Sequence, residues 1–367
     1  MLESPHEAQN TATKILPSIV IIISLMGGLF IGIIAVTCLG HIEITWAQVV
    51  KIIYANITFQ KELLTQFDEV LTVVVWDVRL PRIITACAVG GGLAISGTIF
   101  QGLLSNPLAD PYTLGVSAGA AFGASLALLL NVGFMGSYSV PLFAFLGAGA
   151  TLMFVIYLSS STSQVSSHNL ILSGIIVSAI LSAGISFIKY IADEQVSVII
   201  FWLMGSFASK TWTDAILVTS ILSISMLICI FYARDLNLMV LGHRTAAALG
   251  TNIRTITYIL LITASMIAAV CVSVSGIIGF IGLLVPHMMR SIVGPDNRVL
   301  LPISMIAGAL LLLIGDTITR AILPHEIPIG VLTALIGGPF FCYIFRKQQL
   351  GVKRGCFIIF MTITSLT

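Results

Sequence analysis

The chain has 367 residues, of which 57% are hydrophobic and only 9% are charged, and its mean hydropathy is +1.08. A soluble globular protein carries about a quarter charged residues, so most of this surface cannot face water and the composition indicates a polytopic membrane protein. The formal net charge of +2 and the lack of a Lys/Arg run exclude a nucleic-acid surface.

Ten tracts are candidate membrane crossings, since a span needs about 20 apolar residues. The sequence therefore predicts an all-α polytopic membrane domain over 16–347, with tails at 1–15 and 348–367. The Gly-rich tract 276–289 is short and must be buried in protein where it enters the membrane. The ten tracts are 16–39, 83–104, 112–131, 139–159, 169–191, 214–232, 255–275, 276–289, 299–319 and 328–345.

The distribution of Lys and Arg gives an expected orientation. With the N-terminus in the cytoplasm, ten crossings return the C-terminus there, and ten of the 17 basic residues lie on the cytoplasmic side against seven outside. This bias is modest but has the sign of the positive-inside rule.

Two outer segments are expected to be structured. Residues 45–57 form an amphipathic pattern with Trp46 and Tyr54, which predicts a helix on the outer membrane surface. Residues 193–213 include two tryptophans around glycine and serine, and we interpret them as a partly re-entrant element.

Glycines recur along the second and third predicted spans. Small residues let helices approach closely in lipid, so these glycines predict tight helix packing. A nucleotide loop would require a strand–turn–helix context, which is missing. The glycines concerned are Gly90, Gly91, Gly92, Gly97, Gly102, Gly115, Gly119 and Gly123.

The predicted spans contain few groups that could perform chemistry. There is no HExxH motif, and His287 is the histidine nearest to a membrane segment. Asp316 is the clearest carboxylate inside a span, and its place four residues before Arg320 predicts an ion pair along one helix. Coupling carboxylates of a secondary carrier and an intramembrane catalytic set are thus poorly represented. Both classes stay as alternatives.

Three arginines lie at the outer ends of spans, against the usual charge bias. An arginine at the centre of a span costs about 2.5–3.5 kcal/mol on insertion scales. These side chains could simply reach the lipid headgroups, or they could form an outward ring that pairs with carboxylates of a docking protein. The three are Arg79, Arg82 and Arg320.

The segment Leu238–Gly250 is too short and too polar to cross a membrane, although apolar tracts flank it. Alanine and leucine favour helix, and Gly242 and Gly250 can bracket two helical turns. We expect a cytoplasmic helix that another protein can hold. Two further inner turns, Asn106–Pro111 and Gly294–Asn297, are tight and proline-containing.

Several runs resemble the FecCD-type permeases of ABC importers for iron chelates, haem and cobalamin. They are RLPRIITACAVGGGLAISGTIFQGLLSNPLADPYTLGVSAGA (79–120), LGHRTAAALG (241–250), SGIIGFIGLLVPHMMR (275–290) and EIPIGVLTALIGGPF (326–340). The resemblance implies a type II ABC importer permease fold in the cytoplasmic membrane. It also implies a homo- or heterodimer around a central path, with a separate cytoplasmic ATPase, an extracytoplasmic substrate-binding protein, no cofactor and no catalytic residue.

The resemblance also implies roles for individual residues. The ATPase would be coupled through Leu241, Gly242, Ala246, Leu249 and Gly250. The binding protein would dock on Arg79, Arg82 and Arg320, and a cytoplasmic gate would comprise Asn106, Leu108 and Ser167. A ferric siderophore is the expected substrate, with haem, cobalamin and molybdate as alternatives.

Two features depart from the resemblance. His243 and Arg244 stand where relatives often have an acidic residue, so the surface of the ATPase partner is expected to differ. The C-terminal tail 351–367 extends beyond the usual end, and its apolar part is too short to span a bilayer.

Overall fold

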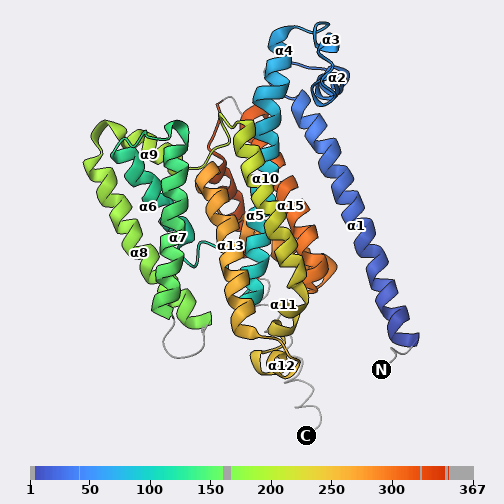
Figure 1. Ribbon diagram of the computed structural model, residues 1–367, viewed down its shortest axis with the longest axis vertical. Helices are drawn as coiled ribbons and strands as arrows, with labels where there is room; N and C mark the ends of the chain where they lie inside the picture. Colours follow the sequence, from blue (N-terminus) through green and yellow to red (C-terminus); the bar gives the residue numbers. More distant parts are fainter. Residues whose placement is uncertain (1–4, 41, 160–166, 323–324, 344–345, 347–367) are drawn as a thin grey trace.

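The computed structural model describes residues 5–40, 42–159, 167–322, 325–343 and 346. Over this part all regular secondary structure is helical (Figure 1). The C-terminal tail lies outside the described residues, whereas α1 already begins at Pro5, within the predicted N-terminal tail. The elements are α1 (Pro5–Cys38), α2 (Trp46–Ile57), α3 (Lys61–Leu64), α4 (Glu69–Val73), the π-helix η1 (Val74–Arg79), α5 (Leu80–Leu103), α6 (Val116–Leu129), η2 (Gly136–Tyr138), α7 (Ser139–Ser159), α8 (Ser167–Ile191), η3 (Asp193–Gln195), α9 (Val196–Leu203), α10 (Trp212–Phe231), α11 (Ala233–Val240), α12 (His243–Ala248), α13 (Ile253–Ser275), α14 (Ile281–Val293), α15 (Asn297–Thr317) and the π-helix η4 (Ile318–Ile322), followed by a helix over Ile329–Tyr343.

The number and positions of the apolar helices agree with the prediction. Among the described residues, seven helices are long and apolar enough to cross a membrane, and three shorter apolar helices accompany them: Val116–Leu129, Ile281–Val293 and Ile329–Tyr343. Each of the ten falls on one of the ten predicted tracts. The second begins earlier than predicted, because α4, η1 and α5 continue as one rod over Glu69–Leu103.

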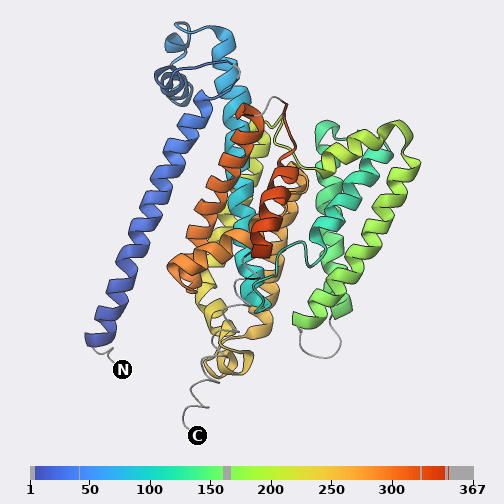
Figure 2. The ribbon, with the colours of Figure 1, turned by 180° about the vertical axis from the view of Figure 1, so that it is seen from behind.

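Helix α5 is the centre of the bundle and is buried along almost its whole length. Figures 1 and 2 show it in the middle, with α1 along one side and the α6–α8 group along the other. A Cβ on Gly90 would lie 2.3 Å from the carbonyl oxygen of Gly308 in α15, and one on Gly97 would lie 1.8 Å from that of Gly282 in α14. The predicted role of these glycines in helix packing is confirmed.

Glycines also allow close helix contacts within the α6–α8 group. A Cβ on Gly119 would meet the Gly147 carbonyl oxygen of α7 at 2.5 Å, and one on Gly123 would meet that of Phe143 at 2.1 Å. The third span therefore presents its small face to the fourth, as expected for helices that pack in lipid.

Helices α13 and α14 are separated by a short non-helical segment, residues 276–280. Gly276 and Phe280 both have positive φ, +72° and +68°. Gly276 and Ile278 are buried. Gly276 N–H donates to the Val272 carbonyl at 2.8 Å, and the Phe280 carbonyl accepts from Leu284 N–H at 2.8 Å. Non-helical backbone at membrane depth requires such burial, so the expectation for tract 276–289 holds.

The segment 42–73 forms a cap of short helices at one end of the bundle, which we call the α2 end (Figure 1). Thr45 caps α2 in a capping box with Gln48, and Val49, Ile52 and Ala55 form its buried face. Val49 and Ile52 of that face pack against Val75 and Leu80, whereas Trp46 remains 72% exposed. The predicted amphipathic helix is therefore present, with its apolar face covered by protein.

Candidate functional site

The opposite end of the bundle carries α11 and α12, and we call it the α12 end (Figure 1). Helix α11 buries Ala233, Leu236 and Met239. The chain then breaks at Gly242, whose φ is +113°, and α12 ends before Gly250, whose φ is +88°. Positive φ favours glycine, so the two glycines bracket α12 as the sequence predicts.

The five predicted coupling residues do not all face outward. Leu241 and Leu249 are 68% and 61% exposed, and they lie on either side of α12. Ala246 is fully buried against the chain. With the exposed Arg244 and Thr245, Leu241 and Leu249 form an exposed surface beyond the apolar helices, which we call the α12 patch.

A cluster of amides joins α11 to the start of α15. Asn237 Oδ1 accepts from the backbone N–H of Asn297 at 2.9 Å and from its side-chain Nδ2 at 2.7 Å. Asn237 Nδ2 donates to Asp296 Oδ1 at 2.6 Å, and Asp296 also caps α15. The sequence predicts only a turn at residues 294–297. In the structure Asp296 is the N-cap of α15, and no sequence signal indicates that Asn237 contacts this turn.

The predicted gate residues lie in two places. Asn106 Oδ1 accepts from the N–H of Leu108 at 2.9 Å, which fixes the turn after α5, and Leu108 is 38% exposed. Ser167 is the first residue of α8 and is half-buried. Residues 160–166, which precede it, lie outside the described part of the chain.

Asp110 in the turn between α5 and α6 is buried, and its Oδ1 accepts from the N–H of Thr113 at 3.0 Å. Burial raises the pKa of this carboxyl to about 6, against the opposing hydrogen bonds from Thr113 and Tyr112. The folded chain thus binds a proton more tightly than the unfolded chain does, so stability should rise as pH falls from about 6 to 4.

We expect Asp110→Asn to remove this pH dependence and to stabilise the protein at pH 8 by on the order of 2–3 kcal/mol. Thermal unfolding of the purified wild type and variant at pH 5 and pH 8 measures the pH dependence of stability. A wild-type protein that is equally stable at both pH values would contradict the expected burial of the charge.

The predicted docking arginines cluster at the α2 end, where two of them hold the end of α1. Arg79 donates to the carbonyls of Thr37 and Ile42, both at 2.7 Å. Arg320 donates to the carbonyls of Leu39 at 3.0 Å and Val36 at 3.2 Å. The last carbonyls of a helix lack partners within it and carry partial negative charge, so both guanidinium groups act as caps for α1.

Arg82 is buried between two carboxylates. Its Nε and Nη2 bind both oxygens of Asp316 at 2.7–3.1 Å, and Nη2 also binds Glu326 Oε1 at 2.5 Å. The predicted pair between Asp316 and Arg320 is therefore wrong. The chain changes to the π-helix η4 at Ile318, so α-helical spacing does not apply and Arg320 turns toward α1.

The arginine ring consequently consists of engaged side chains. Arg79 is 5% exposed and Arg82 is 9% exposed. Among the ion-paired side chains Arg82, Asp316 and Glu326, Glu326 is the most accessible to solvent, with 45% of its side chain exposed.

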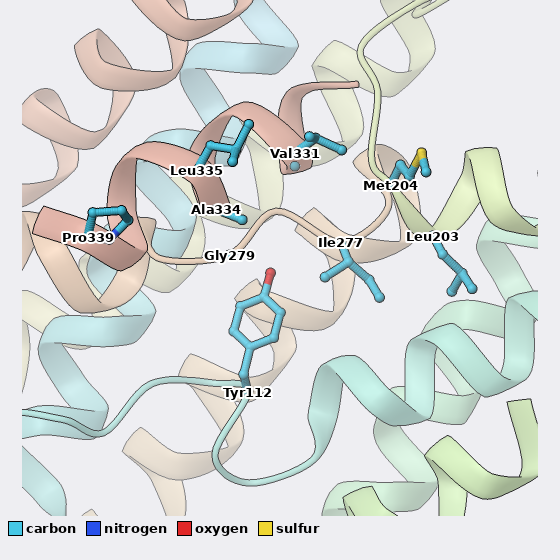
Figure 3. A pocket seen from close by; sticks show the side chains of 10 residues that line it. Tyr112, Leu203, Met204, Ile277, Gly279, Val331, Ala334, Leu335 and Pro339 are labelled. Atoms are coloured by element: carbon cyan, nitrogen blue, oxygen red, sulfur yellow. The ribbon is translucent and has the colours of Figure 1, made fainter. Parts of the chain in front are cut away.

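A cavity of about 660 Å³ lies between the non-helical segment 276–280, the end of α9 and the helix Ile329–Tyr343 (Figure 3). Its described lining carries no charged side chain. Tyr112 points into it and donates its hydroxyl hydrogen to the Ile278 carbonyl. The lining is Tyr112, Leu203, Met204, Ile277, Gly279, Gly330, Val331, Ala334, Leu335 and Pro339.

The arrangement thus has a polar anchor at each end and an uncharged cavity. Within the described residues, no group of three His, Cys, Asp or Glu side chains could hold a metal ion. Helix α15 connects the two ends, because Asn297 bonds to α11 and Asp316 bonds to Arg82. Such an arrangement can transmit movement between surfaces at opposite ends of the bundle.

Comparison with known proteins gives consistent matches. The FecCD transport family matches residues 28–347. The molybdate import system permease protein of Haemophilus influenzae is 37% identical over 85% of this chain and 91% of its own. The Fe(3+)-citrate import system permease protein of Bacillus subtilis is 38% identical over 77% of this chain and 84% of its own. Other relatives at 38% identity are named for hemin and cobalamin.

The fold also matches a solved structure, an inward-facing conformation of an ABC transporter described as metal-chelate type. The TM-score is 0.78 and the identity 33%, over 89% of this chain and 99% of that chain. This match confirms the predicted type II importer permease fold.

Proposed function

This chain belongs to the FecCD transport family, and from that membership we propose that it is the permease of an ATP-driven importer for a ferric siderophore. It is a permease subunit and not an enzyme, so a separate ATPase hydrolyses ATP. The observation that carries the proposal is the α12 patch, in which two exposed leucines flank a short helix beyond the apolar spans. An exposed apolar pair of this kind suits a protein partner.

The α12 end is proposed to face the cytoplasm and the α2 end the outside. Helix α1 starts at the α12 end in Figure 1, which agrees with cytoplasmic termini. Two ATPase subunits would bind the α12 patches of two permease subunits, identical or different, and closure of the ATPases would move α12. The amide cluster of Asn237 and Asn297 would carry this movement to α15.

The α2 end is proposed to receive the substrate-binding protein. Arg82 and Arg320 interact with two carboxylates, Asp316 and Glu326, and Arg79 lies beside Arg320, so the cluster holds one more positive than negative charge. A carboxylate on the partner would complement that charge. At the other end, Asn106, Leu108 and Ser167 are proposed to contribute the cytoplasmic gate.

The uncharged cavity supports a large organic chelate as the substrate. An oxyanion such as molybdate calls for cationic or N–H donors, whereas a large organic chelate suits apolar walls with a single hydroxyl such as that of Tyr112. By this criterion a ferric siderophore fits the cavity better than molybdate does, as would haem or cobalamin, which are also large organic chelates. Haem, cobalamin and molybdate are the alternatives, since relatives named for each are similarly close.

The test is ligand-stimulated ATP hydrolysis by the reconstituted complex of permease, ATPase and binding protein. We expect ferric siderophore to stimulate hydrolysis more than haem, cobalamin or molybdate do. Stronger stimulation by one of the alternatives would reassign the substrate and leave the importer function standing.

A further inference from the structure

Arg82 shares its guanidinium group between two carboxylates that differ in their surroundings. Asp316 in α15 is almost fully buried, with 2% of its side chain exposed, and binds both Nε and Nη2. Glu326 is 45% exposed and binds through Nη2 alone. The buried pair is difficult to break, because either charge would be left without a partner. An exposed pair adds little and exchanges readily.

The surrounding charges favour the arrival of another carboxylate. Arg320 lies within electrostatic reach of Arg82, Asp316 and Glu326, and Arg79 lies within reach of Arg320. Arg320 Nε is buried without a hydrogen-bond partner. The cluster therefore has an excess of positive charge, and Arg320 Nε is a donor without an acceptor. The exposed carboxylate of Glu326 binds Arg82 Nη2.

Glu326 is also linked to the wall of the cavity. Only Ile327 and Pro328 separate it from the helix Ile329–Tyr343. That helix supplies Val331, Ala334 and Leu335 to the cavity, and its start is tied to α9 through Gly330 N–H and the Met204 carbonyl. The bond between Glu326 and Arg82 is thus a second tie on the start of this helix.

We propose that Glu326 holds the place of a carboxylate of the binding protein on Arg82, and that docking exchanges the two and releases the start of the helix Ile329–Tyr343. The released helix moves the cavity wall as the substrate is delivered. Docking and release are therefore one event, because both use the same nitrogen of Arg82. This inference rests on the proposed function, since its partner is the substrate-binding protein.

The experiment compares Glu326→Gln with Glu69→Gln, which removes an equal charge from an exposed position on α4 at the same end. Affinity for the loaded binding protein is measured with full-length permease–ATPase complexes in nanodiscs. We expect Glu326→Gln to bind about two- to fivefold more tightly, since an exposed pair competes weakly, and Glu69→Gln to bind like wild type or with a much smaller gain. Unchanged or weaker binding by Glu326→Gln would overturn the proposal.

Hydrogen exchange over residues 325–335 provides a second measurement. We expect faster exchange in Glu326→Gln alone, and in wild type once the binding protein docks. Equal exchange in free and docked wild type would overturn the proposed release, even if the variant did not fold. Wild-type complexes that bind no binding protein at all would instead overturn the proposed function.

Discussion

Replacing Gly97 with alanine should destabilise the bundle more than the same change at the other glycines that the structure describes. The new Cβ would lie 1.8 Å from the Gly282 carbonyl oxygen and 2.4 Å from its carbonyl carbon. These are backbone atoms, so no rotamer change relieves the clash, and α5 and α14 must separate. Overpacking costs about 1–3 kcal/mol in ordinary cores, and we expect about 3 kcal/mol or more here. Thermal stability and yield of the detergent-extracted protein measure this effect.

Gly149→Ala is the matched control, because a Cβ on Gly149 in α7 meets nothing within 4 Å. This variant should unfold at or slightly above the wild-type temperature, because alanine favours a helix interior over glycine by about 0.5–1 kcal/mol. If Gly97→Ala were as stable as Gly149→Ala, the close approach of α5 and α14 would be wrong.

The second large effect is expected at the α12 patch. Leu241→Asp and Leu249→Asp place a charge on side chains that are exposed in the permease, so folding should be unchanged. An apolar anchor at the centre of an interface contributes about 2 kcal/mol or more. We therefore expect more than tenfold weaker binding of the ATPase and a matching loss of uptake, as measured by titration of ATPase into permease nanodiscs.

Ile57→Asp is the control for this experiment. Ile57 ends α2 and is 63% exposed, so the change in chemistry is the same but lies at the α2 end. It should leave ATPase affinity intact. Ala246→Leu is a poor probe, since Ala246 is buried and a larger side chain would disturb the packing of α12 itself. Wild-type ATPase affinity in both leucine variants would reject the α12 patch as the coupling surface.

Features set by local sequence were predictable. The spans follow from hydropathy, and the close contacts of α5 follow from glycine spacing. Gly242 and Gly250 mark the ends of α12 because a positive φ favours glycine. Which side of α12 faces outward was not predictable, since a helix of six residues is too short for a reliable periodicity.

Features set by distant residues were missed. Arg82 meets Asp316 and Glu326 across 234 and 244 positions of sequence, and no periodicity spans such a separation. The expected pair of Asp316 and Arg320 assumed an α-helix where the chain forms a π-helix. Asn237 and Asn297 meet only because α11 folds back on the start of α15. The polar contacts at both ends therefore depend on tertiary structure.

The central claim is that ATP hydrolysis acting at α12 drives import, and uptake into sealed proteoliposomes tests it most directly. Permease, ATPase and binding protein are reconstituted with ATP inside, and labelled ferric siderophore is added outside with no ion gradient. We expect uptake that requires ATP and falls at least tenfold with Leu241→Asp. Uptake that proceeds without ATP when a proton or sodium gradient is applied would contradict the claim.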